Sequence, residues 1–402
     1  MTGGSVWLAA GAGEALRRVV RHAWDHSPAW RARLEAAGIR PEDVRGPEDL
    51  LPLPVLRKEA LGRHQAASLP FGGLLGVPVS DLARIFVSPG PVYDPQGARE
   101  DFWRFSRALR AAGFAPGDVV LNCFSYHLSP AGFMLDTGLR AAGCVVIPGG
   151  VGQQDLQVRV LSDTGATGYV GLPSYLLSLL ERAEALGLRT ALRKAYVTAE
   201  PLPPSLRARL QGYGVEVFQG FGTADLGSVA YECEVREGQH LDPGVMVEVC
   251  DPEGRPVPAG EVGELVVTLL DETYPLLRFG TGDLTALVPE PCPCGRPEPR
   301  IRGWLGRAGE AVKVRGMFVY PDQIQEAVSR IPGAGRWHAV VDRDGGHRDR
   351  LTVRVEAAGV VDPAALSQAI KATTRVTAEV ELVEPGTLPD KTPRIEDRRR
   401  WE

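Results

Sequence analysis

The most informative segment of the chain is Arg278-Phe279-Gly280-Thr281-Gly282-Asp283-Leu284. It places a carboxylate after a turn of small residues, and an apolar run typical of a strand precedes that turn. A hydride-transfer enzyme would need Gly-x-Gly-x-x-Gly followed by a helix, and this segment lacks both the last glycine and the helix. The chain also contains no Gly-x-Ser-x-Gly elbow, so the sequence does not indicate an α/β-hydrolase.

Upstream of this segment, short apolar runs alternate with helical stretches. The pattern predicts strands at 84–87, 119–124, 144–147, 168–171, 195–198 and 215–219, and helices at 102–112, 133–142, 156–163, 174–186 and 204–213. Such alternation indicates βαβ units and a parallel sheet. Ligands in these folds bind beyond the carboxyl ends of the strands, so the turns that follow the strands are candidate sites.

The two ends of the chain have different patterns. The first 65 residues are helical and rich in arginine, and the sequence becomes β-rich after residue 240. The last hundred residues alternate strands with helices at 321–331 and 363–373. We therefore predict an α/β protein with a large N-terminal domain at 1–308, which has parallel sheets and a β-rich subdomain. A small mobile α+β C-terminal lid follows at 309–402.

Composition narrows the class of protein. The 402 residues, 44% hydrophobic and 24% charged, suit a globular protein of two or three domains. A net charge of −5 argues against a nucleic-acid binder. The sequence contains no run of about 18 uncharged apolar residues, so it predicts no membrane-spanning helix. Six cysteines are too few for a secreted disulfide scaffold, so a reducing, cytoplasmic location is expected.

Three further segments stand out: Phe221-Gly222-Thr223-Ala224-Asp225, Gly306-Arg307 through Lys313-Val314-Arg315-Gly316, and Lys391-Thr392-Pro393-Arg394-Ile395-Glu396-Asp397-Arg398. Together with 278–284 they resemble the adenylate-forming enzymes, in particular the phenylacetate–CoA ligase branch. The resemblance implies that a carboxylate, aryl by family analogy, attacks the α-phosphate of Mg·ATP to give an acyl-adenylate and pyrophosphate. A thiol, usually of coenzyme A, then displaces AMP. A homodimer is left open.

The same resemblance assigns the nucleotide site. Asp283 would accept bonds from both ribose hydroxyls, and Arg307 would offset the charge of the nucleotide. Glu200-Pro201 and Phe221-Gly222-Thr223 would line the adenine pocket, with Phe221 standing where relatives have a tyrosine. A plain turn or N-cap role is the alternative for Asp283.

Two catalytic charges are assigned in the same way. Asp225 stands where relatives hold Mg²⁺ with a glutamate, and the shorter side chain would still reach the ion through a water molecule. Lys391 aligns with the adenylation lysine, which stabilises charge that develops on the carboxylate and phosphate. The segment before Lys391 is shorter than in relatives. A loop carboxylate and a surface lysine are the competing interpretations.

The phosphate loop departs most from the family. Relatives carry a Ser/Thr/Gly-rich loop that ends in Gly-Lys-Pro, and residues 87–95 retain only Ser88 and Gly90 of it. Prolines in this stretch remove N–H donors. Asp94 replaces the lysine, and its negative charge would repel a phosphate by about 1 kcal/mol or more for each near contact. Two interpretations follow. One is an active ligase that binds the ATP phosphates more weakly. The other is an impaired or inactive relative that binds AMP, acyl-adenylate or CoA thioester as a sensor or partner-binding protein.

Four residues suit a metal. Cys233, His240, Cys292 and Cys294 supply three thiolates and one imidazole, a set suited to structural Zn²⁺. Some relatives in the resembling branch hold a metal at these positions. The Cys-x-Cys spacing is tighter than the usual gap, so ordinary reduced thiols and a surface histidine remain the alternative.

The acyl pocket and the hinge complete the assignment. Tyr126 and His127 follow a predicted strand, and Gly149 and Tyr175 are expected to border the same pocket, although a core or turn role is equally compatible with the sequence. Gly309 takes the hinge position after the Gly-Arg pair, where glycine absorbs a large change of backbone angle.

Overall fold

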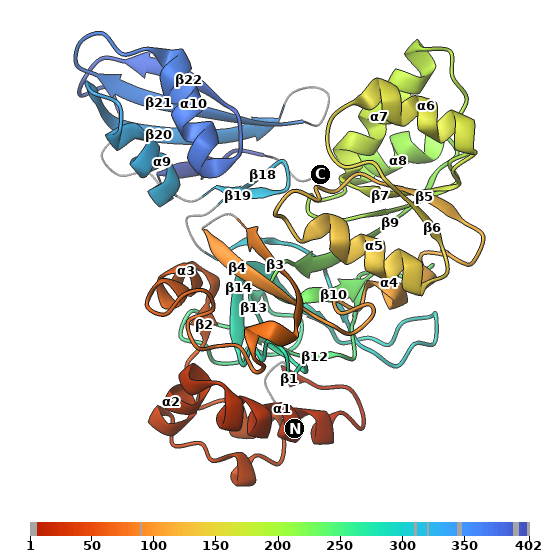
Figure 1. Ribbon diagram of the computed structural model, residues 1–402, viewed down its shortest axis with the longest axis vertical. Coiled ribbons are helices and arrows are strands. Elements are labelled where there is room, and N and C mark those ends of the chain that lie inside the picture. Colours follow the sequence, from red (N-terminus) through yellow and green to blue (C-terminus); the bar gives the residue numbers. More distant parts are fainter. Residues whose placement is uncertain are drawn as a thin grey trace. The chain divides into compact units, whose positions relative to one another are not determined.

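The computed structural model describes residues 6–88, 91–308, 312–319, 321–343, 348–388 and 394–399 (Figure 1). By its contacts the chain divides into two compact units. The first contains residues 1–198 and 210–308, and the second contains residues 199–209 and 309–402. Both units combine helices with strands, which confirms the predicted α/β class.

A nine-stranded sheet runs through the first unit, and its parallel part follows the predicted alternation. The spatial order of the parallel strands is β6 (Val145–Pro148), β5 (Val119–Asn122), β7 (Gly168–Gly171), β8 (Lys194–Val197) and β9 (Glu216–Thr223). The helices that link them in the chain are α5 (Ala131–Ala141), α6 (Gln154–Thr164), α7 (Pro173–Ala185) and α8 (Pro204–Gly212). Because these strands are parallel, the turns after β5, β6 and β7 gather at one edge of the sheet.

The helix predicted at 102–112 is shorter than expected. Helix α4 (Phe105–Ala111) begins only after Arg104, which has a left-handed φ of 64°. The Asp101 carboxylate accepts a hydrogen bond from the backbone N–H of Ser106 at 3.0 Å and so caps the first turn. Within the described residues, every helix falls short of the length and apolar character that a bilayer crossing requires.

The nine-stranded sheet continues with antiparallel strands that the sequence pattern did not predict. They are β10 (Gly227–Tyr231), β11 (Gln239–Leu241), β16 (Arg300–Ile301) and β15 (Leu287–Val288), added in that order beyond β9. Tyr231 faces His240, and His240 faces Arg300 across the ladder. Three distant segments therefore meet here.

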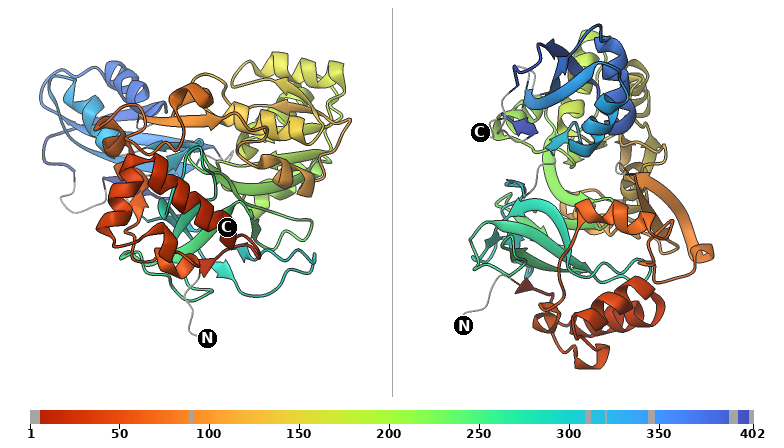
Figure 2. Two further views of the ribbon diagram at one scale, coloured as in Figure 1. Left: turned by 60° about the horizontal axis from the view of Figure 1, so that its bottom comes forward. Right: turned by 90° about the vertical axis from the view of Figure 1, so that its left-hand side faces the viewer.

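A second sheet forms the β-rich part of the first unit. Its strands are β1 (Val6–Trp7), β12 (Val245–Cys250), β13 (Gly263–Leu269), β14 (Phe279–Thr285) and β17 (Gly306–Arg307), and β2 (Leu56–Arg57) runs parallel to β14. Helices α1 (Gly13–His26) and α2 (Pro28–Ala36) pack their apolar residues into the core of this sheet (Figure 2). Helix α3 (Lys58–Ala66) and the 3₁₀ turns Pro41–Asp43, Pro47–Leu50 and Val79–Asp81 complete the N-terminal region.

Arg278 anchors this region. Its guanidinium is buried, pairs with Glu248 at 2.8 Å, and donates to the carbonyl oxygens of Leu51 and Leu53 at 2.7 Å each. Those contacts fix the chain just before β2, which pairs with β14. Arg278, the first residue of the segment 278–284, thus stabilises the packing of the N-terminal region against the second sheet. Asp283 lies five residues further along the chain.

Residues around the expected phosphate loop form a hairpin. Strand β3 (Leu82–Ser88) pairs with β4 (Val92–Gly97), and Asp94 lies opposite Phe86. The strand predicted at 84–87 is therefore present and longer. Asp94 lies in a strand, not in an open loop, and it is only 1% exposed.

The second unit has its own core. A four-stranded sheet has the order β22 (Ala378–Val383), β21 (Asp349–Ala357), β20 (Ala334–Arg343) and β23 (Ile395–Asp397). The other elements are the hairpin β18 (Val312–Val314) and β19 (Met317–Val319), with helices α9 (Pro321–Ser329) and α10 (Pro363–Thr374). Apolar residues of both helices and of the sheet share one buried cluster.

Candidate functional site

Asp283 and Arg307 meet at the β17 edge of the second sheet. They are partners across the ladder of β14 and β17, and Arg307 Nη1 donates to Asp283 Oδ1 at 3.0 Å. Trp304 Nε1 donates to the same oxygen at 2.9 Å. Asp283 thus lies within a strand, not in the turn expected after one, because Gly306-Arg307 extends the sheet beside it. Trp304 was missed, since no spacing rule marks it.

Gly282 makes room for this pair. It has φ of +71°, and a Cβ there would lie 3.0 Å from Arg307 Nη2 and 2.9 Å from the Glu59 carboxylate. A side chain would therefore push the guanidinium away from Asp283. Glu59, on α3, lies 3.7 Å from Arg307, so the arginine is flanked by two carboxylates.

The candidate adenine segment is divided between the two units. Phe221, Gly222 and Thr223 end β9 in the first unit, whereas Glu200 and Pro201 follow β8 and belong to the second. A Cβ on Gly222 would lie 2.6 Å from the carbonyl oxygen of Gly227, so only glycine permits this close approach. The Thr223 hydroxyl accepts a hydrogen bond from the N–H of Leu226 at 3.2 Å and shapes the turn that carries Asp225.

Asp225 is buried and pairs with a lysine that sequence reasoning missed. Lys58 Nζ, at the start of α3, donates to Asp225 Oδ2. Both side chains are buried, with exposed fractions of 7% for Lys58 and 0% for Asp225. The chain separates them by 167 residues, and no motif links them.

Asp94 lies beside this ion pair. Burial, followed by repulsion from Asp225, raises the pKa of Asp94 to about 8, although Lys58 favours its charged form. The hydroxyl and N–H of nearby Ser88 also favour the charged form of Asp94, but among the described residues neither carboxylate oxygen has a donor at full hydrogen-bond distance and angle. Ser88 Oγ donates instead to the carbonyl oxygen of Val92 at 3.4 Å. The residue that replaces the loop lysine is therefore near Asp225.

Three predicted residues lie outside the described part of the chain. They are Gly90 of the phosphate loop, the hinge residue Gly309 and the catalytic residue Lys391.

Tyr126, Gly149 and Tyr175 lie at the carboxyl edge of the parallel strands. Gln157 joins two of them, because its Nε2 donates to the Gly149 carbonyl at 3.1 Å and its Oε1 accepts from the Tyr175 hydroxyl at 2.6 Å. Burial raises the pKa of Tyr175 to about 12. Both tyrosines lie near the buried Cys123, which places them in one region. Gln157 carried no signal in the sequence.

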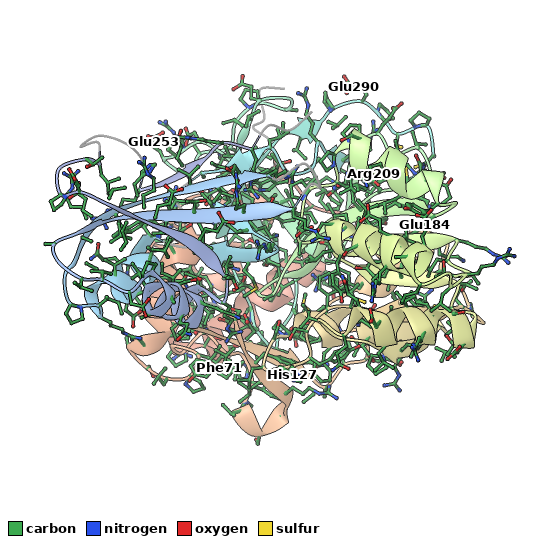
Figure 3. All side chains as sticks on the ribbon, turned by 90° about the horizontal axis from the view of Figure 1, so that it is seen from above. Phe71, His127, Glu184, Arg209, Glu253 and Glu290 are labelled. Carbon is green, nitrogen blue, oxygen red and sulfur yellow. The ribbon has the colours of Figure 1, made fainter. Side chains whose placement is uncertain are left out.

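The Tyr126 hydroxyl is held in a polar network. It accepts from Asn122 Nδ2 at 2.8 Å and donates to Asp136 at 3.1 Å. Burial, followed by the charge of Asp136, raises the pKa of Tyr126, so the hydroxyl stays protonated. His127, in contrast, is exposed, and Figure 3 labels its position. Of the two neighbours, Tyr126 has the fixed orientation that a pocket wall needs.

The four candidate metal ligands come together. Cys233, His240, Cys292 and Cys294 offer ligand atoms that all lie within 4.8 Å of one another. The Sγ atoms of Cys233 and Cys292 are 3.7 Å apart, and Cys294 Sγ lies 3.3 Å from His240 Nε2. A tetrahedral zinc ion with metal–sulfur bonds of about 2.3 Å separates its sulfur ligands by about 3.8 Å. The donor set and its spacing therefore fit Zn²⁺.

The orientation of His240 supports that fit. Its ring is buried, and Nδ1 lies 2.8 Å from the carbonyl oxygen of Glu298. A carbonyl only accepts, so Nδ1 carries the proton and Nε2 keeps its lone pair toward the sulfur atoms. Strands β11 and β16 fix this arrangement, because they carry His240 and position the chain just after Cys294.

Comparison with known proteins gives a consistent result. The sequence pattern of the AMP-binding enzyme family matches residues 102–268, and that of the AMP-binding enzyme C-terminal domain matches residues 316–399. The phenylacetate–coenzyme A ligase of Thermus thermophilus is 34% identical over 360 residues, which cover 85% of this chain and 80% of that protein. The phenylacetate–coenzyme A ligase of Aromatoleum evansii is 31% identical over 427 residues, covering 96% and 93%.

Solved structures agree. The crystal structure of 2-hydroxyisobutyryl-CoA ligase in complex with 2-HIB-AMP and CoA superimposes with a TM-score of 0.88 at 28% identity. The match covers 96% of this chain and 88% of that one. These similarities extend over both units of the chain.

Proposed function

The chain belongs to the AMP-binding, adenylate-forming enzyme family, and from this premise we propose that it is an ATP-dependent acid–thiol ligase. A carboxylate oxygen attacks the α-phosphate of ATP, which breaks the α–β phosphate link and releases pyrophosphate. The thiol of coenzyme A then attacks the acyl carbonyl, and AMP leaves. The observation that carries the proposal is the buried Asp283–Arg307 pair, which we assign to the nucleotide, in a chain that resembles CoA ligases over most of its length.

Asp283 and Arg307 have distinct roles in this proposal. The Asp283 carboxylate accepts hydrogen bonds from the ribose hydroxyls, and Trp304 holds it in place through the bond to Oδ1. Arg307 offsets the negative charge of the phosphates. Phe221 offers its ring face to the adenine. Thr223 shapes the turn beside that ring through its bond to Leu226.

The acid is proposed to lie against Tyr126 and Tyr175. Two aromatic side chains with fixed hydroxyls suit a flat aryl acid, in line with phenylacetate named for the relatives. Gly149 lets the turn after β6 lie close to β5, because a Cβ there would lie 2.6 Å from Cδ1 of the buried Leu121. Lys391 then stabilises charge at the reacting carboxylate and phosphate.

Two metals are part of the proposal. Asp225 offers a carboxylate oxygen to Mg²⁺, a hard ion that would neutralise phosphate charge when bound. Cys233, His240, Cys292 and Cys294 would hold Zn²⁺ with four protein ligands. A closed site of this kind leaves no open position for chemistry, so its role is structural. It would join the strand pair β10–β11 to the segment before β16, and its thiolates favour a reducing compartment such as the cytoplasm.

Domain motion is proposed at the boundary. Residues 1–308 form the body that holds the nucleotide and acid, and residues 309–402 form a lid that rotates about Gly309. Such rotation would let one site serve both the adenylation and thioester steps.

Pyrophosphate exchange tests the proposal. Labelled pyrophosphate should enter ATP when the protein is given the right acid from a panel that includes phenylacetate, benzoate and 2-hydroxyisobutyrate. Mass spectrometry should then detect the matching CoA thioester after coenzyme A is added. A Lys391→Ala variant should bind AMP normally and lose the exchange.

The inactive alternative makes a different prediction. A sensor or partner-binding relative would bind AMP and show no exchange with any acid. The likeness to named CoA ligases over most of the chain favours the active enzyme. AMP binding without exchange across the whole panel would reverse that preference.

A further inference from the structure

Three segments of the first unit bring charged side chains into one buried cluster. Lys58 comes from the first turn of α3, Asp94 from the hairpin strand β4, and Asp225 from the turn after β9. Counted over the whole residue, backbone included, their exposed fractions are 7%, 1% and 5%. Asp94 interacts electrostatically with both of the other residues. We refer to these three residues as the Asp94 cluster.

The Asp94 cluster holds two carboxyl groups and only one ammonium group, so without a further cation the second carboxyl, that of Asp94, keeps its proton. Lys58 pairs with Asp225 through Oδ2, so its charge is used by one carboxylate. Asp225 Oδ1 and both oxygens of Asp94 are buried and have no hydrogen-bond partner among the described residues. Buried carboxylate oxygens in proteins are hydrogen-bonded, paired with a cation or bound to a metal. Three unpartnered oxygens from two carboxylates therefore point to a cation that belongs beside them.

We propose that Asp94 and Asp225 together bind one divalent cation before any nucleotide arrives. The two carboxylates offer only oxygen atoms as metal ligands, so the site suits a hard ion such as Mg²⁺ or Mn²⁺. The soft thiolates lie in the separate Cys/His cluster. This inference rests on the proposed function for its biological purpose, while the binding itself is independent of it.

The cation would replace the positive charge of the lysine that the phosphate loop lacks. Relatives hold phosphates with a loop lysine, and here that position is Asp94. Lys58, ionised Asp225 and protonated Asp94 are together neutral, and a divalent ion that replaces the proton on Asp94 changes the net charge to +1. A positive cluster attracts a polyphosphate more strongly than a neutral one does. Asp94 is then the residue that recruits a cation in place of the lysine.

Titration of the nucleotide-free, full-length protein with Mn²⁺ tests the inference. Electron paramagnetic resonance measures free Mn²⁺ directly, and it does not depend on catalysis. The wild-type protein should bind about one Mn²⁺ per chain that excess Mg²⁺ displaces. Asp94→Asn should weaken this binding by at least about tenfold, because one of two carboxylates is lost. Asp225→Asn should weaken it similarly.

A matched control separates specific binding from surface charge. Glu253 is exposed on a turn (Figure 3), and Glu253→Gln should leave the Mn²⁺ affinity unchanged. Asp94→Asn keeps the side-chain shape and replaces one neutral buried group with another, so the variant should fold; circular dichroism checks this. The wild-type titration stands even if the variant does not fold.

Two results would overturn the inference. The first is the absence of Mn²⁺ binding to the nucleotide-free wild type. The second is an Asp94→Asn variant that binds Mn²⁺ as tightly as the wild type. Either result leaves pyrophosphate exchange by the wild-type protein intact, so it is distinct from a failure of the ligase proposal. Conversely, the wild-type protein could bind Mn²⁺, lose that binding in Asp94→Asn, and show no pyrophosphate exchange with any acid. That combination would refute only the ligase proposal.

Discussion

Replacing Asp283 with asparagine isolates the charge of the ribose site. The amide has the same shape, and its oxygen still accepts from Trp304 and Arg307, which lie 2.9 and 3.0 Å from Oδ1 in the wild type. What changes is the strength of the bonds to the ribose hydroxyls. A hydrogen bond to a charged group contributes about 1.5–3 kcal/mol. The expected loss of AMP affinity is therefore about 10- to 150-fold.

Calorimetry with two ligands makes this prediction specific. AMP and 2′,3′-dideoxy-AMP differ only in the hydroxyls that Asp283 is proposed to hold. The wild type should bind dideoxy-AMP more weakly than AMP, and Asp283→Asn should discriminate far less between them. The coupling free energy between the Asp283→Asn substitution and the removal of the ribose hydroxyls measures the contact between Asp283 and those hydroxyls.

A second buried pair provides the control. Asp242 is 2% exposed and lies 3.2 Å from Arg104 Nε, so Asp242→Asn also removes charge from a buried carboxylate–arginine pair. It should lower the thermal stability and leave AMP affinity unchanged. The reasoning is refuted if Asp283→Asn keeps the full preference for AMP over dideoxy-AMP.

Three further predictions concern the other parts of the first unit. Cys294→Ser should reduce the zinc content from about one ion per chain, measured by mass spectrometry, because it removes one of four ligands; Cys144→Ser, outside the cluster, should keep the metal. Gly149→Ala should raise KM for the acid and leave AMP affinity unchanged, since the new methyl group would collide with Leu121 and displace the turn that carries residue 149; an unchanged KM would contradict the proposed place of this turn beside the acid. Burial opposes ionisation of Asp118, but hydrogen bonds from Ala115, Thr167 and Lys194 prevail and hold its pKa below the usual value. The stability it contributes is therefore present above pH ~4 and lost as pH falls through the folded-state pKa. Asp118→Asn should lower the free energy of unfolding by about 1 kcal/mol at pH 7, and chemical denaturation should find no difference between the two proteins at pH ~2.

The parallel part of the fold was predictable because its signals are local. Each strand of that sheet is a short apolar run, and each crossover is a helix with its own periodicity. The antiparallel strands were not predictable in this way. Strands β15 and β16 have two residues each, too few for any alternation. Their pairing depends on the contact of segments far apart in the chain, such as His240 with Arg300.

The same distinction applies to the candidate site. Asp283 and Arg307 each lie in a recognisable segment, so the sequence indicated both. Lys58, Trp304 and Gln157 lie in no such segment, and only the fold brings them to Asp225, Asp283 and Gly149. A side chain that acts by contacting a motif residue leaves no pattern of its own.

Asp94 illustrates what a motif cannot tell. In the sequence it places a negative charge where a phosphate would lie, and on that basis the loop counts against ATP use. In the structure its carboxylate is buried beside Asp225 and Lys58, so its effect depends on what those neighbours hold. With a cation between the two carboxylates, Asp94 and the ion together carry +1, the same charge as the lysine that Asp94 replaces. The loss of a loop lysine is therefore weak evidence for the loss of activity, because charge at a phosphate site is a property of the whole cluster.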